Sequence, residues 1–450
     1  MTAQRFINLR AAASLAAACV MAGCSAGLQG APYLQSGPAL RALDSTGAGK
    51  IAHVVYIVQE NRSFNNLFMG YPGAKTASSA KNSKGQTIEL TPVSLAKQYE
   101  IDHSAKAMFA ACDGTGKLPG TQCRMDAFDK ESATGNVPHP QFVYVPRKES
   151  KPYWDIAHEW VLADRMFPSQ LDESFVAHQY IIAAQAQSSV NVPQLGWGCG
   201  GEPGDAVKTI TLKRKYGSSQ TPCFDYQTLG DELDDAGLPW RFYTSQYNGF
   251  DISGFWSAYQ AVNHIFNGPD WKKDVIVPQS QFITDVAAGH LASFTWITPV
   301  CENSDHVSCG GGYGPSWVAS LVNAVGESKF WNNTVIFVQW DDWGGLYDPV
   351  PPPFEDYDGL GVRVPLMAIS AYAKSNYVSH QQYETASVLR FAEDLFGLGR
   401  LSAADARAAS PARDFFDFSQ KPRKFVPIKS PQGPAFFLHQ PHDYRIPDEQ

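Results

Sequence analysis

The sequence predicts an α/β protein in which helices flank a central, mostly parallel sheet. Short apolar runs rich in β-branched residues recur along the chain, and segments with a helical pattern lie between them. Continuous apolar runs are typical of strands buried on both faces, and alternating strands and helices are typical of layered α/β folds. Hydrophobic residues make up 44% of the chain and charged residues 18%, so a large core can form.

Each element follows from its own pattern. Strands are expected at 51–58, 240–244, 294–297, 334–340 and 364–369, and helices at 153–162, 175–186, 317–325 and 385–396. The stretches 70–150 and 187–225 lack these patterns and are expected to form loop insertions over one edge of the sheet. The Pro- and aromatic-rich tail after Leu401 is expected to wrap the core, so that residues 50–450 form a single domain.

Residues 1–24 are predicted to be a signal peptide. A weakly basic segment precedes an apolar run, 11–22, that is too short to span a bilayer. The run leads into Met21-Ala22-Gly23-Cys24, which resembles a lipoprotein cleavage box. Under this interpretation Cys24 is acylated and attaches the protein to a membrane, whereas ordinary cleavage near the same place leaves it unattached.

Both interpretations export the protein to the periplasm, to the outer membrane as a lipoprotein, or to the medium. Residues 25–49, rich in Gly, Ala, Ser and Pro, are expected to form a flexible spacer. Of the eight cysteines, Cys19 and Cys24 lie in the signal, which leaves an even number, as expected for an oxidising compartment. Many pairings are open, and we favour those between sequence neighbours, Cys112–Cys123, Cys199–Cys223 and Cys301–Cys309.

The net charge of the chain argues against a general nucleic-acid binder. The net charge is −8 and the pI is near 5.8, whereas nucleic-acid-binding proteins are usually basic.

Two predicted strands run into polar clusters, Gln59-Glu60-Asn61 and Asp341-Asp342. Ligands bind at the carboxyl ends of strands in open α/β sheets, and carboxylate and amide oxygens suit a divalent cation. Taken alone, either cluster is better explained as a helix cap or a turn.

A serine and two histidines are the other candidates for chemistry. Ser174 lies in the first turn of a predicted helix, where backbone N–H groups and the helix dipole favour an alkoxide or a phosphate, although an isolated serine there is better explained as a cap. His103 and His306 each follow an aspartate in a polar loop. Histidine can stabilise a phosphoryl oxygen, donate to a leaving group or bind a metal, but a lone loop histidine is usually solvated. His53, inside the first strand, is expected to be packed.

Together these segments resemble the phosphoesterase family of bacterial phospholipases C and AcpA-type acid phosphatases. The motifs that carry the resemblance are Ile51–Val55 with Glu60-Asn61-Arg62-Ser63-Phe64, Leu162–Ser169 with Ser174 and Ala177-His178-Gln179-Tyr180, Trp340–Asp348 with Val350-Pro351-Pro352-Pro353, and Gly361–Pro365 with Ser370–Lys374 and Val378–His380. They extend from about Lys50 to Gly397 and are specific as an ordered set.

The resemblance implies an alkaline-phosphatase-like layered fold, one divalent metal ion and a serine nucleophile. Carried over residue by residue, the metal ligands are Glu60, Asn61, Asp341 and Asp342, together with the nucleophile Ser174. His103 and His306 fall at positions that resemble active-site histidines of the acid phosphatases. Oxygen ligands favour Ca, Mg or Mn, and Zn also accepts carboxylates.

We therefore expect metal-dependent hydrolysis of a phosphate ester through a phosphoserine intermediate, with His306 or His103 assisting the departing alcohol. A phospholipase C activity that releases the head group of a phosphodiester, including a phospholipid, is the first expectation, and a phosphatase activity on monoesters is the alternative. An alternative of another class is a catalytically silent, lipid-anchored binding protein. It draws on two departures from the family pattern: Asp172-Glu173 replaces Gly-Pro, and Pro349 replaces His.

Overall fold

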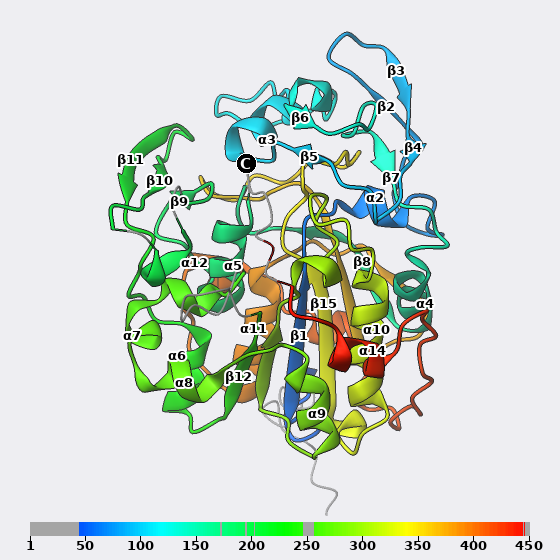
Figure 1. The fold of residues 1–450 in the computed structure, drawn as a ribbon, viewed down its shortest axis with the longest axis vertical. Helices are drawn as coiled ribbons and strands as arrows, with labels where there is room; N and C mark the ends of the chain where they lie inside the picture. Colours follow the sequence, from blue (N-terminus) through cyan, green and yellow to red (C-terminus); the bar gives the residue numbers. More distant parts are fainter. Residues whose placement is uncertain are drawn as a thin grey trace, which may run out of the picture.

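The computed structural model describes residues 45–171, 173–193, 196–201, 203–245, 256–443 and 445 (Figure 1). The predicted signal peptide, Cys24 and most of the predicted spacer lie outside these ranges, as does Asp172. Within the described ranges, no helix combines the length and the hydropathy needed to cross a membrane.

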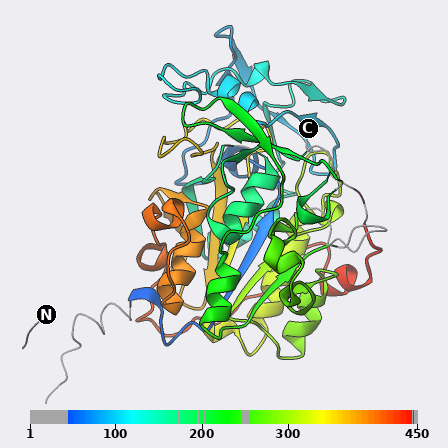
Figure 2. The same cartoon turned by 90° about the vertical axis from the view of Figure 1, so that its left-hand side faces the viewer.

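A nine-stranded mixed sheet forms the centre of the molecule (Figures 1 and 2). Its strands lie in the order β13 (Val275–Ile276), β12 (Trp240–Tyr243), β14 (Phe294–Ile297), β1 (His53–Gln59), β15 (Thr334–Trp340), β16 (Val364–Ser370), β8 (Val161–Phe167) and β17 (Tyr377–Ser379), with β18 (Tyr383–Glu384) also paired to β8. β1 is parallel to both β14 and β15, whereas β16 is antiparallel to both of its neighbours. The predicted α/β fold with a mostly parallel sheet is therefore confirmed.

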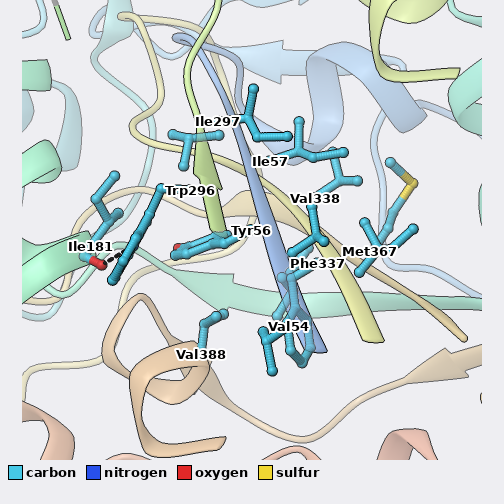
Figure 3. Close-up of a cluster of buried hydrophobic side chains, with 14 of the residues drawn as sticks. Val54, Tyr56, Ile57, Ile181, Trp296, Ile297, Phe337, Val338, Met367 and Val388 are labelled. Atoms are coloured by element: carbon cyan, nitrogen blue, oxygen red, sulfur yellow. Dashed lines mark hydrogen bonds between the residues drawn. The ribbon is translucent and has the colours of Figure 1, made fainter. Parts of the chain in front are cut away.

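The central strands are apolar because both faces of the sheet are covered. Every residue of β15 is buried, as is every residue of β1 after His53, and their side chains form one core with the flanking helices (Figure 3). Two of the polar side chains inside this core are paired: Tyr56 donates to Gln339 Oε1 at 2.6 Å, and the Trp296 indole donates to the Ile181 carbonyl at 2.9 Å. Such pairing removes most of the cost of burying these groups.

Helices cover both faces of the sheet (Figure 2). One face carries α4 (Lys151–Glu159), α9 (Gln281–Ala287), α10 (Gly314–Gly326) and α14 (Pro434–His439), and the other carries α5 (Ser174–Ala183), α6 (Leu229–Asp235) and α11 (Ala386–Phe396). α11 ends at Gly397, whose φ of 72° allows the left-handed cap that glycine adopts at low cost. The buried Phe437 of α14 anchors the tail to the core, together with α12 (Ala403–Arg407) and α13 (Ala412–Phe415).

The predicted insertions contain more secondary structure than the sequence suggested. Segment 70–150 forms the small strands β2 (Ser79–Lys81), β3 (Thr87–Glu89), β4 (Thr91–Pro92), β5 (Glu100–Ile101), β6 (Ala133–Thr134) and β7 (Val143–Tyr144) with the helix α3 (Ala105–Cys112), and segment 187–225 forms β9 (Ser189–Val190), β10 (Val207–Ile210) and β11 (Tyr216–Gln220). These elements lie together over one end of the sheet (Figure 1). The three predicted disulfides are confirmed. Cys112–Cys123 closes a loop within the first insertion, and Cys199–Cys223 closes one within the second.

Other element predictions need correction. The helix expected at 153–162 ends at Glu159, and Val161 begins β8, which the sequence did not predict. The helix expected at 317–325 begins earlier, at Gly314, because Pro315 is well suited to a first helical turn. Residues 45–49 form a turn rather than a free spacer, with Gly47 buried against the Phe418 ring.

Candidate active site

The two polar clusters meet at the carboxyl ends of adjacent parallel strands. Gln59 of β1 pairs with Trp340 of β15, so Glu60-Asn61 and Asp341-Asp342 leave the sheet side by side. The backbone N–H of Asn61 donates to Asp341 Oδ1 at 2.9 Å. Gly344 holds the two loops close, because a Cβ there would lie 2.5 Å from the Asn61 carbonyl oxygen. Neither cluster caps a helix: the cap of α2 (Phe64–Phe68) is Ser63.

The Ser174 hydroxyl lies between these clusters. Ser174 is the first residue of α5, and the N-cap is Glu173, so the serine is not the cap of its own helix. Its Oγ is 3.3 Å from Glu60 Oε2 and 3.4 Å from both Asn61 Oδ1 and Asp342 Oδ2. The hydroxyl is fully buried at the positive end of a helix dipole, where a negative oxygen is stabilised.

His178 also belongs to the site, and the sequence analysis gave it no role. It lies one turn after Ser174 on α5, so the two side chains share a helix face. Its Nε2 is 3.0 Å from Glu60 Oε1 and 3.7 Å from Asp341 Oδ2. Burial lowers the pKa of His178 to about 4, so the imidazole is neutral near pH 7, the form that binds a metal. The i, i+4 spacing from Ser174 was the available signal.

This donor set fits a divalent metal ion. Glu60, His178 and Asp341 each contribute an atom to a group whose members all lie within 4.8 Å of one another. Within the described residues, the buried Asp341 Oδ2 has no hydrogen-bond partner. In the same part of the chain, the ion pairs of Glu60, Asp341 and Asp342 come from His103 and His178 rather than from lysine or arginine. Crowded buried carboxylates repel one another unless a cation or protons intervene, and mixed carboxylate and imidazole ligands are typical of divalent metals.

His103 joins the cluster from the insertion above the sheet. Its Nδ1 lies 2.8 Å from the Ile101 carbonyl, which can only accept, so this nitrogen carries the proton. Its Nε2 is then an acceptor in the neutral ring and lies 3.0 Å from Asn61 Nδ2, which donates to it. Asp342 Oδ2 is 4.0 Å from the same nitrogen. His103 is therefore oriented toward the predicted ligands rather than solvated.

His306 lies beside His103, with 6.2 Å between ring centroids. The backbone N–H of Ser308 donates to His306 Nδ1 at 3.2 Å. The neutral ring therefore carries its proton on Nε2 and can donate from that atom. Burial lowers the pKa of His306 well below its usual value, so the neutral donor form is present at pH 7. The two histidines thus offer opposite functions through Nε2, one accepting and one donating.

The structure brings together every residue that the sequence proposed for the site. Glu60, Asn61, Ser174, His103, His306, Asp341 and Asp342 are all buried around one cluster. Asp348, which closes the same motif as Asp341, is structural instead: it forms an ion pair with the buried Arg363 at 3.0 Å. His53 is packed as expected, with Nδ1 2.8 Å from the Ala292 carbonyl.

Comparisons with known proteins point to one family. The sequence profile of the Phosphoesterase family matches residues 51–399. The chain is 25% identical to the hemolytic phospholipase C of Pseudomonas aeruginosa over 82% of this chain and 56% of that protein. It is 23% identical to phospholipase C B of Mycobacterium tuberculosis, over 84% of this chain and 80% of that protein. The chain therefore spans only about half the length of some of the relatives it matches.

The solved structures that align with this chain are more distant in sequence. A protein of the alkaline phosphatase superfamily from Vibrio parahaemolyticus aligns with 79% of this chain and 70% of its own length, at 10% identity and a TM-score of 0.37. A sulfatase from Pseudoalteromonas aligns with 84% of this chain and 78% of its own length, at 11% identity and a TM-score of 0.39.

Proposed function

Because the chain belongs to the phosphoesterase family, we propose that it hydrolyses phosphate esters, with Ser174 as the nucleophile and a divalent metal ion as cofactor. The observation that carries the proposal is the position of Ser174 Oγ, within 3.4 Å of Glu60, Asn61 and Asp342 at the N-terminus of a buried helix. These residues come from three separate stretches of the chain, and a structural role for Ser174 does not require their convergence.

The proposed roles follow from the donor atoms. Glu60, Asp341, Asp342, Asn61 and His178 would hold the metal, which when bound lowers the pKa of a hydroxyl or water and offsets negative charge on a phosphoryl group. Ser174 attacks phosphorus, so that an Oγ–P bond forms, the bond to the alcohol breaks, and the proton lost from Oγ leaves with the alcohol. His306 donates a hydrogen bond from Nε2 to the departing oxygen. A water molecule then attacks phosphorus and releases Ser174.

For the substrate we propose a phosphodiester of the phospholipase C type. This choice draws on the names of the relatives, which include phospholipases C from bacteria and from Arabidopsis thaliana. A phospholipid would then leave its phosphorylated head group on Ser174 for release by water. Two features of the site are compatible with a monoester: the buried His103 and His306 add polar groups to the cluster that contains the serine.

The experiment is a comparison of two esters. Purified protein is freed of metal, resupplied with Mg, Mn, Ca or Zn in turn, and assayed on a phosphocholine diester and on a simple phosphate monoester. We expect turnover of the diester with one of these ions, and loss of turnover in Ser174→Ala and Asp342→Asn. A preference for the monoester would favour the acid phosphatase alternative. Hydrolysis of neither ester with any ion would favour the silent binding protein and overturn the proposal.

We also propose that the protein is exported and carries a signal peptide with an acylated Cys24. The disulfides support export, because such bonds persist in oxidising compartments. Mass spectrometry of the mature N-terminus from a bacterial host tests this proposal. A lipid-modified cysteine at the first position is expected, and an intact N-terminal segment would contradict it.

A further inference from the structure

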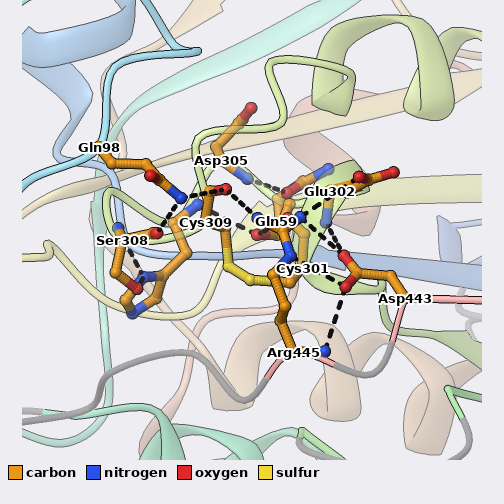
Figure 4. Close-up of a disulfide and its surroundings, with 11 residues drawn as sticks. Gln59, Gln98, Cys301, Glu302, Asp305, Ser308, Cys309, Asp443 and Arg445 are labelled. Carbon is orange, nitrogen blue, oxygen red and sulfur yellow. Dashed lines mark hydrogen bonds and ion pairs between the residues drawn. A yellow bond between two sulfur atoms is a disulfide. The ribbon is translucent and has the colours of Figure 1, made fainter.

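The loop that carries His306 is held from two sides. This loop, 301–309, is closed by the Cys301–Cys309 disulfide (Figure 4). On the inner side, Gln59 accepts from the Asp305 N–H at 3.0 Å and donates to the Asn303 carbonyl at 2.9 Å. Gln59 directly precedes Glu60, so the histidine loop and the carboxylate cluster share one support.

The outer side of the loop is held by the C-terminal tail. Asp443 Oδ2 accepts from the Glu302 N–H at 2.7 Å, and Arg445 Nη1 donates to the Cys309 carbonyl at 2.8 Å. Figure 4 shows these two residues side by side near the disulfide that joins the two ends of the loop. Gln440 donates from Nε2 to Glu302 Oε2 at 2.9 Å, and its Oε1 accepts from Asn303 Nδ2 at 2.8 Å. The tail therefore binds both ends of a loop more than a hundred residues earlier in the chain.

The tail residues are organised for these contacts. Asp443 and Arg445 form an ion pair of 2.9 Å with each other, and the Asp443 side chain is only 6% exposed. Gln440 immediately follows α14, whose Phe437 is buried in the core. The segment is thus anchored before it reaches the loop, and a short anchored segment loses little entropy when it binds.

We propose that Asp443, with Gln440 and Arg445, is a positioning element for His306 in the reaction. This inference depends on the proposed function, in which His306 Nε2 donates to the departing oxygen. The disulfide closes the loop and Gln59 holds its inner side, while the tail prevents the loop from moving outward. Since the His306 ring is oriented by Ser308 of the same loop, a displacement of the loop displaces the donor.

The first test is kinetic. Asp443→Ala removes the acceptor for the Glu302 N–H, and a displacement of a catalytic group by about 1 Å can reduce turnover up to about a hundredfold. We expect kcat to fall between about ten- and a hundredfold with KM nearly unchanged, and more for an alkyl than for a nitrophenyl leaving group. Asp443→Asn, which keeps an acceptor oxygen, should recover most of the rate. Gln432→Ala is the matched control, because Gln432 lies in the same tail but contacts Ser316 of α10.

A double-mutant cycle separates positioning from general stabilisation. In a His306→Ala background, Asp443→Ala should lower kcat by less than about twofold, because the group that Asp443 positions is already absent. Fully additive losses would overturn the positioning role. Hydrogen exchange supplies a readout that does not depend on turnover: amides of 301–309 should lose protection in Asp443→Ala but not in Gln432→Ala, and unchanged protection would also overturn it. Wild-type protein that hydrolyses neither ester would overturn the proposed function and, with it, the catalytic role of the tail.

Discussion

Asp341→Asn should make the metal-free protein more stable while removing its stabilisation by metal. Asp341 Oδ2 is buried without a hydrogen-bond partner in the described part of the chain, and it lies within 4.8 Å of a Glu60 oxygen. Two unit charges at that distance repel by roughly 3 kcal/mol at an effective dielectric constant of 20. The amide keeps the oxygen that accepts from the Asn61 N–H but carries no charge, so it relieves most of this repulsion.

The opposite effect is expected when metal is present. A ligand at about a thousand times its Kd stabilises the wild type by about 4 kcal/mol, and the loss of a carboxylate ligand should remove most of that gain. For a chain of this size, 1 kcal/mol corresponds to roughly 1 °C in Tm. We therefore expect Asp341→Asn to melt about 3 °C higher than wild type without metal, and to lack the wild type's metal-induced rise of about 4 °C.

Differential scanning calorimetry of chelator-treated protein, with each of Mg, Mn, Ca and Zn added back, measures both quantities. Asp348→Asn is the matched control, since this aspartate is equally buried on the same segment but is paired with Arg363. It should lose stability without metal and keep the metal-induced rise. An Asp341→Asn protein that gains as much from the metal as the wild type would refute the ligand assignment.

Three further predictions follow from other contacts. His178→Ala should weaken metal binding by about 10- to 100-fold, measured by isothermal titration calorimetry; unchanged affinity would exclude His178 from the site. Arg363→Met leaves Asp348 buried without its partner and should cost about 3–5 kcal/mol of unfolding free energy in urea, with partial recovery in the double variant with Asp348→Asn; a cost below about 1 kcal/mol would show that the pair contributes little. Burial raises the pKa of Glu393 to about 9 from the usual 4.5, so its protonated form stabilises the fold fully below pH 4.5, and that contribution is lost as the pH rises through 9. The Tm of Glu393→Gln should therefore change less than the Tm of the wild type between pH 5 and pH 9. Parallel curves of Tm against pH for the two proteins would contradict the raised pKa of Glu393.

The sequence predicted the centre of the sheet well and its edges poorly. The strands β1, β14, β15 and β16 are buried on both faces, which leaves continuous apolar runs that can be recognised without alignment. β8 was missed because its Val161-Leu162-Ala163 start continues the apolar pattern of α4 across Trp160. β13 and β18 have two residues each, and strands that short are defined by tertiary pairing rather than by local pattern.

The sequence identified most of the residues of the site, but not the contacts between them. Glu60 and Asp341 were found because each follows a buried strand, which places them at one edge of the sheet. His178 was missed because all ten residues of α5 are buried, so the apolar pattern does not mark a separate face toward the site, and the i, i+4 spacing from Ser174 was the signal that remained. The link between Asp443 and the His306 loop joins segments far apart in the chain, and no local pattern encodes it.

Direct detection of a covalent intermediate on Ser174 is the most decisive test of the account. Protein quenched in acid during turnover of either ester should yield, by peptide mass spectrometry, a phosphorylated adduct on Ser174 that Ser174→Ala and Asp342→Asn lack. Steady turnover with Ser174 unmodified at every quench time, or with the adduct on another residue, would contradict the claim that the hydroxyl at the start of α5 attacks phosphorus.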